Sequence, residues 1–193
     1  MEKLYDFYEL ACKRAPISRE SWDIFAAKLD FHDVKKADFL VRPGSEKRVI
    51  FIVMEGVARN YCLDEKGREY TKTFRGPGGV IGPYAEILEG VPSRYFIQAV
   101  TDLKCLSFQY SFYEKMMEDF PDWQVFARKM AEENFMEKEQ REFMLLQLPA
   151  SERLKLFKER FGELADQIPQ YQIASYLGIT PESFNRLLKK ENA

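Results

Sequence analysis

Few residues in this chain could bind a metal or act as nucleophiles. There are three cysteines, Cys12, Cys62 and Cys105, and one histidine, His32. Because the cysteines are far apart and odd in number, they indicate neither a disulfide framework nor a paired metal site, and we expect structural thiols. His32 has no second histidine with which to form a metal site, and its neighbours favour a strand residue. The sequence therefore predicts no metal and no catalytic residue, and it disfavours an enzyme such as a metal-dependent cupin.

The residues best suited to contact a partner lie at the carboxyl end. Between residues 169 and 190, an apolar helical pattern stops at Gly178 and resumes after Thr180 and Pro181. A helix ended by glycine, a short turn, and a helix begun by Thr with Pro at its first position are typical of a helix-turn-helix. Ala174 is small enough to let the two helices cross closely. The alternative is an αα-hairpin with a solvated outer face.

The second of these helices carries side chains that can contact DNA. In a major groove its first half would reach base edges and its later basic residues would reach phosphates. Arg186 can pair with guanine, and Glu182 can accept a hydrogen bond from cytosine. The predicted DNA-binding residues are Thr180, Glu182, Ser183, Asn185, Arg186, Lys189 and Lys190.

Charge gives this prediction little support. The formal net charge of the chain is −2, and from Ser151 onward seven Lys/Arg residues face six Asp/Glu residues. A reader of DNA usually presents a distinctly basic face. A ligand-sensing or protein-interaction module that has lost sequence-specific DNA binding therefore remains an alternative function.

The elements that must position this end follow a clear order along the chain. Residues 1–30 have apolar positions at helical spacing, interrupted at Pro16, and predict two amphipathic helices. Residues 31–110 contain six or more short apolar or alternating runs separated by glycine, proline and charged turns, which predict an antiparallel sandwich or barrel. Residues 64–67 (Asp-Glu-Lys-Gly) predict a hairpin turn.

A long helix is predicted over residues 122–147, followed by a break at Pro149 and a further helix over 151–167. At about 1.5 Å per residue the long helix would span roughly 40 Å, more than a small domain needs for its own core. Its apolar positions could pack on the barrel, form a two-fold coiled coil with a second copy, or do both on different faces. No run of about 18 apolar residues is present, so we expect no membrane contact and a cytoplasmic location.

The order of motifs resembles the cyclic AMP receptor protein/Fnr family over nearly the whole chain. The similar stretches are RPG (42–44), IFIVMEGVARNY (50–61), DEKGRE (64–69), GPGGVIG (76–82), SRYFIQAVTDLKCLSF (93–108) and IASYLGITPESFNRLLKK (173–190). This resemblance implies an α+β chain with a jelly-roll sensor domain, a double-stranded β-helix, over 1–120. It further implies a dimerisation helix over 121–148 and a helix-turn-helix DNA-binding domain over 149–193. The implied function is that of a homodimeric transcription regulator, with double-stranded DNA and a second copy as partners and RNA polymerase as a further candidate.

The same resemblance indicates where an effector would bind. The family holds the ribose of a cyclic nucleotide with a Gly-Glu pair and its cyclic phosphate with an Arg-Ser pair. Here Gly82 is matched, but Pro83 replaces the glutamate and the order Ser93-Arg94 reverses the second pair. The predicted effector pocket therefore comprises Gly82, Pro83, Tyr84, Ser93 and Arg94. Proline has neither N–H nor carboxylate, so we expect another small effector, or none, in place of cyclic AMP.

Other cofactors of the family are not expected. The Fnr branch needs four thiolates for its iron–sulfur cluster, and only Cys12 lies near the amino terminus. Neither His32 nor Cys62 is a convincing haem ligand. Two departures from the family concern DNA. The arginine that begins the recognition helix is replaced by Pro181, and the β-hairpin wing that usually follows this helix is not expected, because the sequence ends at Ala193.

Overall fold

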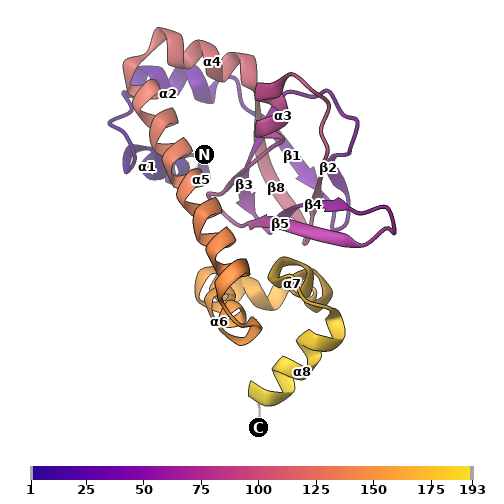
Figure 1. Cartoon of the computed structure of the whole chain (residues 1–193). Coiled ribbons are helices and arrows are strands. Elements are labelled where there is room, and N and C mark those ends of the chain that lie inside the picture. The colour runs from indigo at the N-terminus through magenta and orange to yellow at the C-terminus, as the bar shows by residue number, and fades with distance from the viewer. Residues whose placement is uncertain (1, 192–193) are drawn as a thin grey trace.

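The computed structural model describes the backbone of residues 2–191 and the side chains of residues 7–190. It has three parts: helices at the amino end, a barrel of strands, and a group of helices at the carboxyl end that one long helix connects to the rest (Figure 1). The helices are α1 (Glu2–Cys12), α2 (Arg19–Ala26), α3 (Tyr84–Glu89), α4 (Tyr110–Asp119), α5 (Pro121–Gln147), α6 (Ala150–Phe161), α7 (Gln170–Leu177) and α8 (Pro181–Glu191).

The barrel consists of two four-stranded antiparallel sheets, with strand orders β1-β8-β3-β6 and β2-β7-β4-β5. This is a jelly-roll arrangement, as predicted. The turn at residues 64–67 joins β4 to β5, and Gly67 has a φ of 76° that suits glycine. The strands are β1 (Asp30–Val34), β2 (Phe39–Val41), β3 (Val49–Glu55), β4 (Ala58–Leu63), β5 (Glu69–Arg75), β6 (Val80–Ile81), β7 (Phe96–Ala99) and β8 (Leu103–Gln109).

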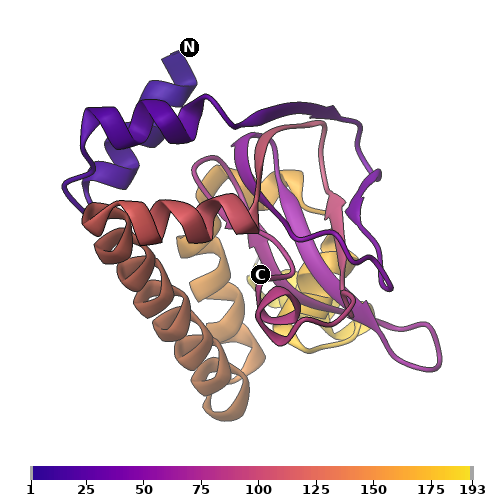
Figure 2. The same cartoon turned by 90° about the horizontal axis from the view of Figure 1, so that it is seen from above.

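The predicted amino-terminal helices are confirmed, and they lie with α4 at one side of the barrel (Figures 1 and 2). Their aromatic side chains share one core with the strands and with α5. Trp22 and Trp123 are both 2% exposed, and Phe25 lies against Trp123 with ring centroids 4.5 Å apart. The indole Nε1 of Trp123 also donates to Ser21 Oγ at 3.0 Å. The start of α5 is therefore held firmly by the amino-terminal helices.

The long helix α5 runs from this core to the carboxyl-terminal helices, close to the predicted bounds. One face carries buried residues at spacings of three and four, among them Trp123, Phe126 and Met144. The opposite face carries exposed apolar side chains: Val125, Phe135, Met136, Phe143 and Leu146. One face of the helix is therefore available for packing on the barrel, and the opposite face is available for contact with a second copy.

One helix boundary differs from the prediction. The α-helix predicted over 151–167 ends at Phe161, and residues 162–167 form a 3-10 helix, η1 (Gly162–Gln167). Gly162 has φ 49° and ψ −131°, a backbone conformation that an α-helix cannot accommodate. The short elements β6 and α3 are also not predicted, because two to six residues give too little periodicity to detect.

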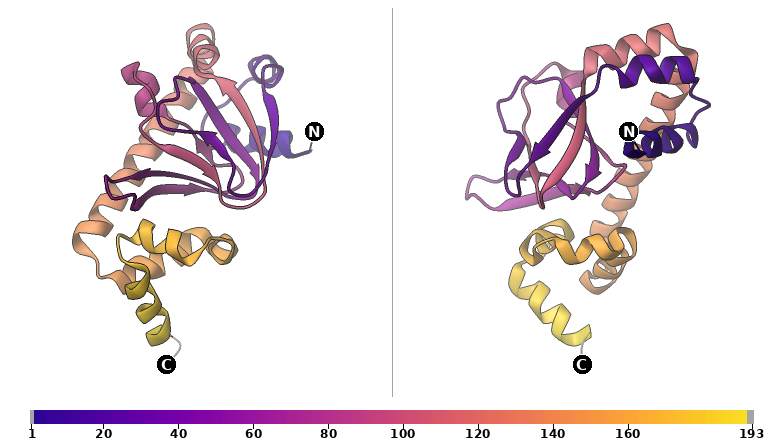
Figure 3. Two further views of the ribbon diagram at one scale, coloured as in Figure 1. Left: turned by 90° about the vertical axis from the view of Figure 1, so that its right-hand side faces the viewer. Right: turned by 180° about the vertical axis from the view of Figure 1, so that it is seen from behind.

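The carboxyl-terminal helices pack against the barrel as well as against each other. Figure 3 shows them in both views below the strands, with α8 extending away from the barrel. Their core includes Phe74 of β5, Val57 and Val100 from connections between strands of the barrel, and Phe157 and Tyr176 from the helices. The two parts of the molecule thus share one hydrophobic cluster.

Candidate nucleic-acid interface and ligand cavity

Helices α7 and α8 form the predicted helix-turn-helix. The first ends at Gly178, which adopts the left-handed conformation with φ 69°. Thr180 then caps the second, because its Oγ1 accepts from the backbone N–H of Ser183 at 3.2 Å. Ala174 is fully buried between the helices, and Phe184 anchors α8 with 2% exposure. The local sequence signals therefore specify this turn as expected.

The seven residues predicted to contact DNA lie together on α8 and the turn before it. Glu182, Asn185, Arg186 and Lys189 recur at spacings of three and four, so they share one face of the helix, and all are exposed. Thr180 and Lys190 are also exposed, and Ser183 is half-buried. Arg186 Nη2 donates to Ser183 Oγ at 3.2 Å. A continuous polar face is thus available on a helix that is anchored from its other side.

The start of α8 favours negative charge. The pKa of Glu182 is lowered, first by a hydrogen bond from its own backbone N–H and then by one with the Thr180 side chain. Free N–H groups at the first turn stabilise a carboxylate in this way. Glu182 is therefore an ionised acceptor at neutral pH.

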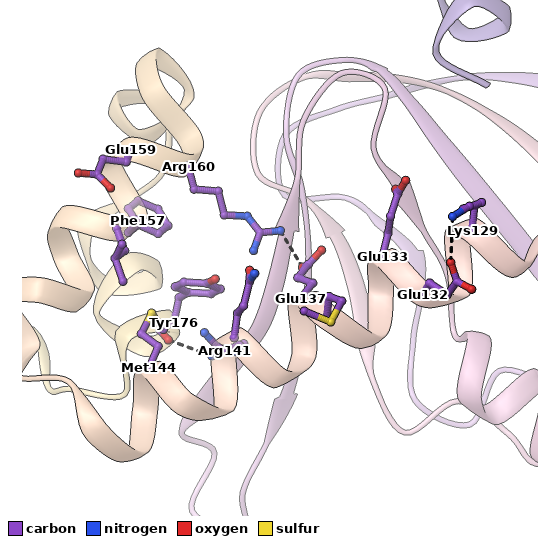
Figure 4. A pocket seen from close by; sticks show the side chains of 13 residues that line it. Lys129, Glu132, Glu133, Glu137, Arg141, Met144, Phe157, Glu159, Arg160 and Tyr176 are labelled. Atoms are coloured by element: carbon purple, nitrogen blue, oxygen red, sulfur yellow. Dashed lines mark hydrogen bonds and ion pairs between the residues drawn. The ribbon is translucent and has the colours of Figure 1, made fainter. Parts of the chain in front are cut away.

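The preceding helix, α7, is docked on strand β5. Ser175 Oγ accepts from the backbone N–H of Thr71 at 2.8 Å and donates to the carbonyl of Glu69 at 2.7 Å. Arg141 of α5 donates from Nη2 to the carbonyls of Thr71 and Tyr176, both at 2.9 Å (Figure 4). Three elements that are distant in the sequence therefore meet at one edge of the barrel.

Glu137 of α5 connects β5 and α6 through charge. Its Oε1 lies 2.8 Å from Arg75 Nη1 of β5 and 2.7 Å from Arg160 Nη2 of α6 (Figure 4). Burial alone would raise the pKa of Glu137, but the charges of Arg75 and Arg160 and their hydrogen bonds lower it below the usual value. The carboxylate is therefore ionised at neutral pH and holds both guanidinium groups.

A cavity of about 280 Å³ lies between the barrel, the amino-terminal helices and α5. This volume is close to the lower end of the range of about 300–1,000 Å³ for small-molecule sites. Aromatic residues form much of the wall, among them Trp22, Phe25 and Trp123. Polar residues from β4, β5 and α5 complete the lining: Asn60, Lys72, Thr73, Arg75, Asn134 and Lys138.

The structure does not bring all the predicted effector residues together. Gly82 and Tyr84 line this cavity. Pro83 and Ser93 line a different hollow of about 320 Å³ beside α3. Arg94 lines neither of them among the described pockets, because its guanidinium pairs with Glu86 and Glu89, each at 3.1 Å. The arginine that could hold a phosphate is thus engaged elsewhere.

The sequence analysis missed the polar residues of the cavity, notably Lys72. The pairing of β4 with β5 shifts between Asn60–Thr73 and Tyr61–Thr71, so Lys72 is an extra residue opposite no partner. Such a bulge turns side chains that would otherwise alternate. No local pattern in the sequence indicates it.

The remaining candidates for chemistry are ordinary structural residues. His32 lies in β1, and its Nε2 is 2.8 Å from Ser107 Oγ. The three cysteines are free thiols, and burial raises the pKa of Cys105 to about 11. Among the described side chains, those of residues 7–190, no group of three or more His, Cys, Asp or Glu could hold a metal ion. Within residues 2–191 no helix combines the length and apolar character needed to cross a membrane.

Comparison with known protein families locates one domain directly. The model of the cyclic nucleotide-binding domain matches residues 31–120, which cover strands β1 to β8 and helix α4. Residues 31–120 are therefore similar to a cyclic nucleotide-binding domain. The cavity therefore lies where this domain meets the amino-terminal helices and α5.

Curated relatives extend the likeness beyond the cyclic nucleotide-binding domain. The anaerobic regulatory protein of Aggregatibacter actinomycetemcomitans and electron transport regulator A of Shewanella oneidensis are each 22% identical to this chain over 166 residues. The match covers 80% of this chain but 64% and 66% of those proteins, so the chain spans a little less than two thirds of each relative.

Solved structures show the same fold. FixK2 from Bradyrhizobium japonicum superposes with a TM-score of 0.70 at 24% identity, over 84% of this chain and 83% of that one. The regulator CLP from Xanthomonas campestris superposes with a TM-score of 0.73 at 15% identity, over 91% and 92%. The fold that the resemblance to the cyclic AMP receptor protein/Fnr family implies is thereby confirmed.

Proposed function

We propose that this chain is a homodimeric transcription regulator that binds double-stranded DNA through α8. The observation that carries the proposal is the placement of this helix. It is anchored by Phe184 on one side, and on the other side Glu182, Asn185, Arg186 and Lys189 are exposed to solvent. The helix itself extends away from the barrel (Figure 3). A helix held in this way can enter a major groove without disturbing the rest of the molecule.

Each side chain on α8 has a separate part in the proposal. Arg186 would pair bidentately with guanine, and Glu182, ionised at the helix start, would accept from cytosine. Ser183 and Asn185 would contact bases or backbone. Lys189 and Lys190, one turn further on, would contact phosphates and supply affinity without sequence preference.

Dimerisation would use the exposed apolar face of α5. Val125 and Leu146 are 21 positions apart, and Met136 and Phe143 are seven apart, so they fit a heptad repeat. Two copies paired along this face would place two α8 helices on a DNA pseudo-palindrome. In functional terms residues 1–120 would then sense, 121–148 would dimerise and 149–193 would bind DNA.

Control would come from a small effector in the cavity, acting in the cytoplasm. We propose no catalytic activity and no resident cofactor, and RNA polymerase stays a candidate partner. An effector can change DNA binding only if it prefers one arrangement of the carboxyl-terminal helices to another. Strand β5 offers a direct connection, because Lys72 and Arg75 line the cavity while Thr71 contacts α7.

In the decisive experiment, the purified protein is used to select DNA from a random library. The affinity for the selected site is then measured by gel shift at several salt concentrations. We expect Arg186→Ala to weaken the preference for that site and to relax it at the base pair that Arg186 contacts, because one lost base pairing costs about 1–3 kcal/mol. Lys189→Ala should weaken binding to all sequences and lower the salt slope by about 1. Lys115→Ala, exposed on α4 at the far end of the molecule, is the control.

Recovery of no preferred sequence would overturn the proposal. It would then favour the alternative of a ligand-sensing or protein-interaction module that has lost sequence-specific DNA binding. Retention of full site preference by Arg186→Ala would reject the assigned role of that residue.

A further inference from the structure

The charges that line the cavity are all positive. Lys72, Arg75 and Lys138 contribute to its surface, and no Asp or Glu is among the described residues that line it. The rest of the wall is mainly aliphatic and aromatic. Lys72 is half-buried, whereas Lys138 is exposed. A partly buried charge at an apolar cavity normally has a partner, because an unpaired charge away from water is costly.

Only one of the three cations has such a partner. Arg75 Nη1 is paired with Glu137 at 2.8 Å. Lys72 and Lys138 have no carboxylate within ion-pair distance among the described residues, and Lys72 lies instead over the ring of Tyr95, 4.3 Å from its centroid. Burial, and next the charge of Lys138, lower the pKa of Lys72. The second effect is that of a neighbouring cation, and the charge of Glu86 acts in the opposite direction.

A buried amide completes this polar end of the cavity. Asn60 is 4% exposed, it lines the cavity, and its Oδ1 has no hydrogen-bond partner among the described residues. Its register partner in β5 is Thr73, directly after the extra residue Lys72. Lys72 and Thr73 both line the cavity, although they are consecutive in a strand. The bulge therefore gathers polar groups at one end of an otherwise apolar space.

We propose that the cavity binds an amphipathic anion, with its acid group between Lys72 and Lys138 near Asn60 and its apolar body against the aromatic wall. This inference rests on the proposed function, because it names the chemical class of the effector. A cyclic nucleotide fits this lining less well. No carboxylate lines the cavity to accept from ribose hydroxyls, and Arg94 is paired with Glu86 and Glu89 outside it.

The two tryptophans of the chain make binding measurable. Trp22 and Trp123 both line the cavity, so their fluorescence should change when it fills. The purified full-length chain is titrated with decanoate, decyl phosphate, decanol and cyclic AMP. We expect saturable binding of at least one anion, about ten-fold or more tighter than decanol, which has the same apolar body without the charge.

The probes also distinguish two sources of the acid group. Tighter binding of decanoate assigns a carboxylic acid, and tighter binding of decyl phosphate assigns a phosphate ester. Equal affinity for decanol and both anions, no saturable binding of either anion, or tighter binding of cyclic AMP than of both would each overturn the proposal.

Substitutions test the two lysines. Lys72→Gln and Lys138→Gln should each weaken binding of the preferred anion about ten-fold and leave decanol unchanged, because each removes one charged hydrogen-bond donor. Lys115→Gln, exposed on α4 and outside the cavity, is the matched control. Lys138 is exposed, so its variant retains the fold even if the half-buried Lys72 proves sensitive. Unchanged anion affinity in Lys138→Gln, together with a folded Lys72→Gln of unchanged affinity, rejects the site.

The failure of this inference can be distinguished from the failure of the proposed function. Arg186→Ala should weaken the sequence preference on DNA and keep its fluorescence response to the anion. Anion binding without any DNA binding would support the proposed anion site and reject the proposed function as a regulator. DNA binding without anion binding would support the proposed function and reject the anion site.

Discussion

Arg59 illustrates how single residues hold the barrel together. It is 1% exposed, and its guanidinium forms two hydrogen bonds with Glu69, at 2.6 and 3.1 Å. It also donates to Gln98 Oε1 at 2.7 and 3.1 Å and lies over the ring of Tyr61 at 3.9 Å. One side chain of β4 thereby ties together β5 and β7. The buried guanidinium thus has both a counter-charge and further hydrogen-bond partners, as a buried charge requires.

Replacement of Glu69, the acid of this pair, should strongly destabilise the fold. Glu69→Ala leaves the buried Arg59 without its counter-charge, and we expect a loss toward the lower end of about 3–5 kcal/mol, since Glu69 itself is 29% exposed. Arg59→Met should lower the stability of the fold by less than Glu69→Ala does, because it removes the buried charge itself and leaves no unpaired guanidinium in the barrel. Urea denaturation measures both. Glu65→Ala in the exposed turn is the control, with a change of about 0.5 kcal/mol or less. A cost for Glu69→Ala as small as that of the control would contradict this account.

At the scale of elements, Glu137 decides how the long helix holds the carboxyl-terminal helices. Because its pKa is lower in the folded chain than its usual value of about 4.3, ionisation favours folding above that value. This contribution is lost as the pH falls through the lowered pKa and the carboxylate is protonated. The contacts of α5 with β5 and α6 should therefore weaken in acid.

The resulting prediction concerns Glu137→Gln. At neutral pH the variant should be less stable than the wild-type chain. The difference should begin to shrink as the pH falls below the usual glutamate pKa of about 4.3, and it should vanish only as the pH falls through the lowered pKa of Glu137 in the folded chain. Urea denaturation at several pH values gives the comparison, with the exposed Glu139→Gln of the same helix as control. A difference that stays constant across this range would refute the role of ionisation.

The elements differ in how far the sequence determines them. The turn between α7 and α8 was predictable because Gly178, Thr180 and Pro181 act within a few residues of each other. The strands and α5 were predictable from period and length. The end of α6 was not, since a glycine inside a polar helix does not reveal whether it will adopt a helical conformation.

The candidate sites differ in the same way. The exposed face of α8 follows from helical spacing, so its residues could be named from the sequence. The cavity depends on side chains from ten separate helices and strands and on an unpaired residue in β5. A family pattern pointed to Arg94, but the structure pairs Arg94 with Glu86 and Glu89 because α3 brings those carboxylates beside it.

For the whole molecule, the most consequential surface is the apolar face of α5. Leu146 is 71% exposed and Phe143 is 60% exposed. A monomeric protein rarely exposes several large apolar side chains along one face of a helix. A second copy would remove this face from water.

We accordingly expect a dimer by light scattering at micromolar concentration. Met136→Glu combined with Phe143→Glu should convert it to a folded monomer, because each charge would have to be buried in the contact between helices. Leu88→Glu, a similarly exposed apolar position on α3, should leave the dimer intact. A monomeric wild-type chain would rule out this use of α5.

The shared hydrophobic cluster of barrel and carboxyl-terminal helices limits how the chain can be divided. The ring of Phe74 lies 6.0 Å from that of Phe157 and 5.6 Å from that of Tyr176. A fragment cut at Pro149 would take two of these rings and leave the third behind. Expressed alone, residues 149–193 should show low helicity by circular dichroism and a tendency to aggregate, so the smallest unit that can be isolated intact extends back through the strands.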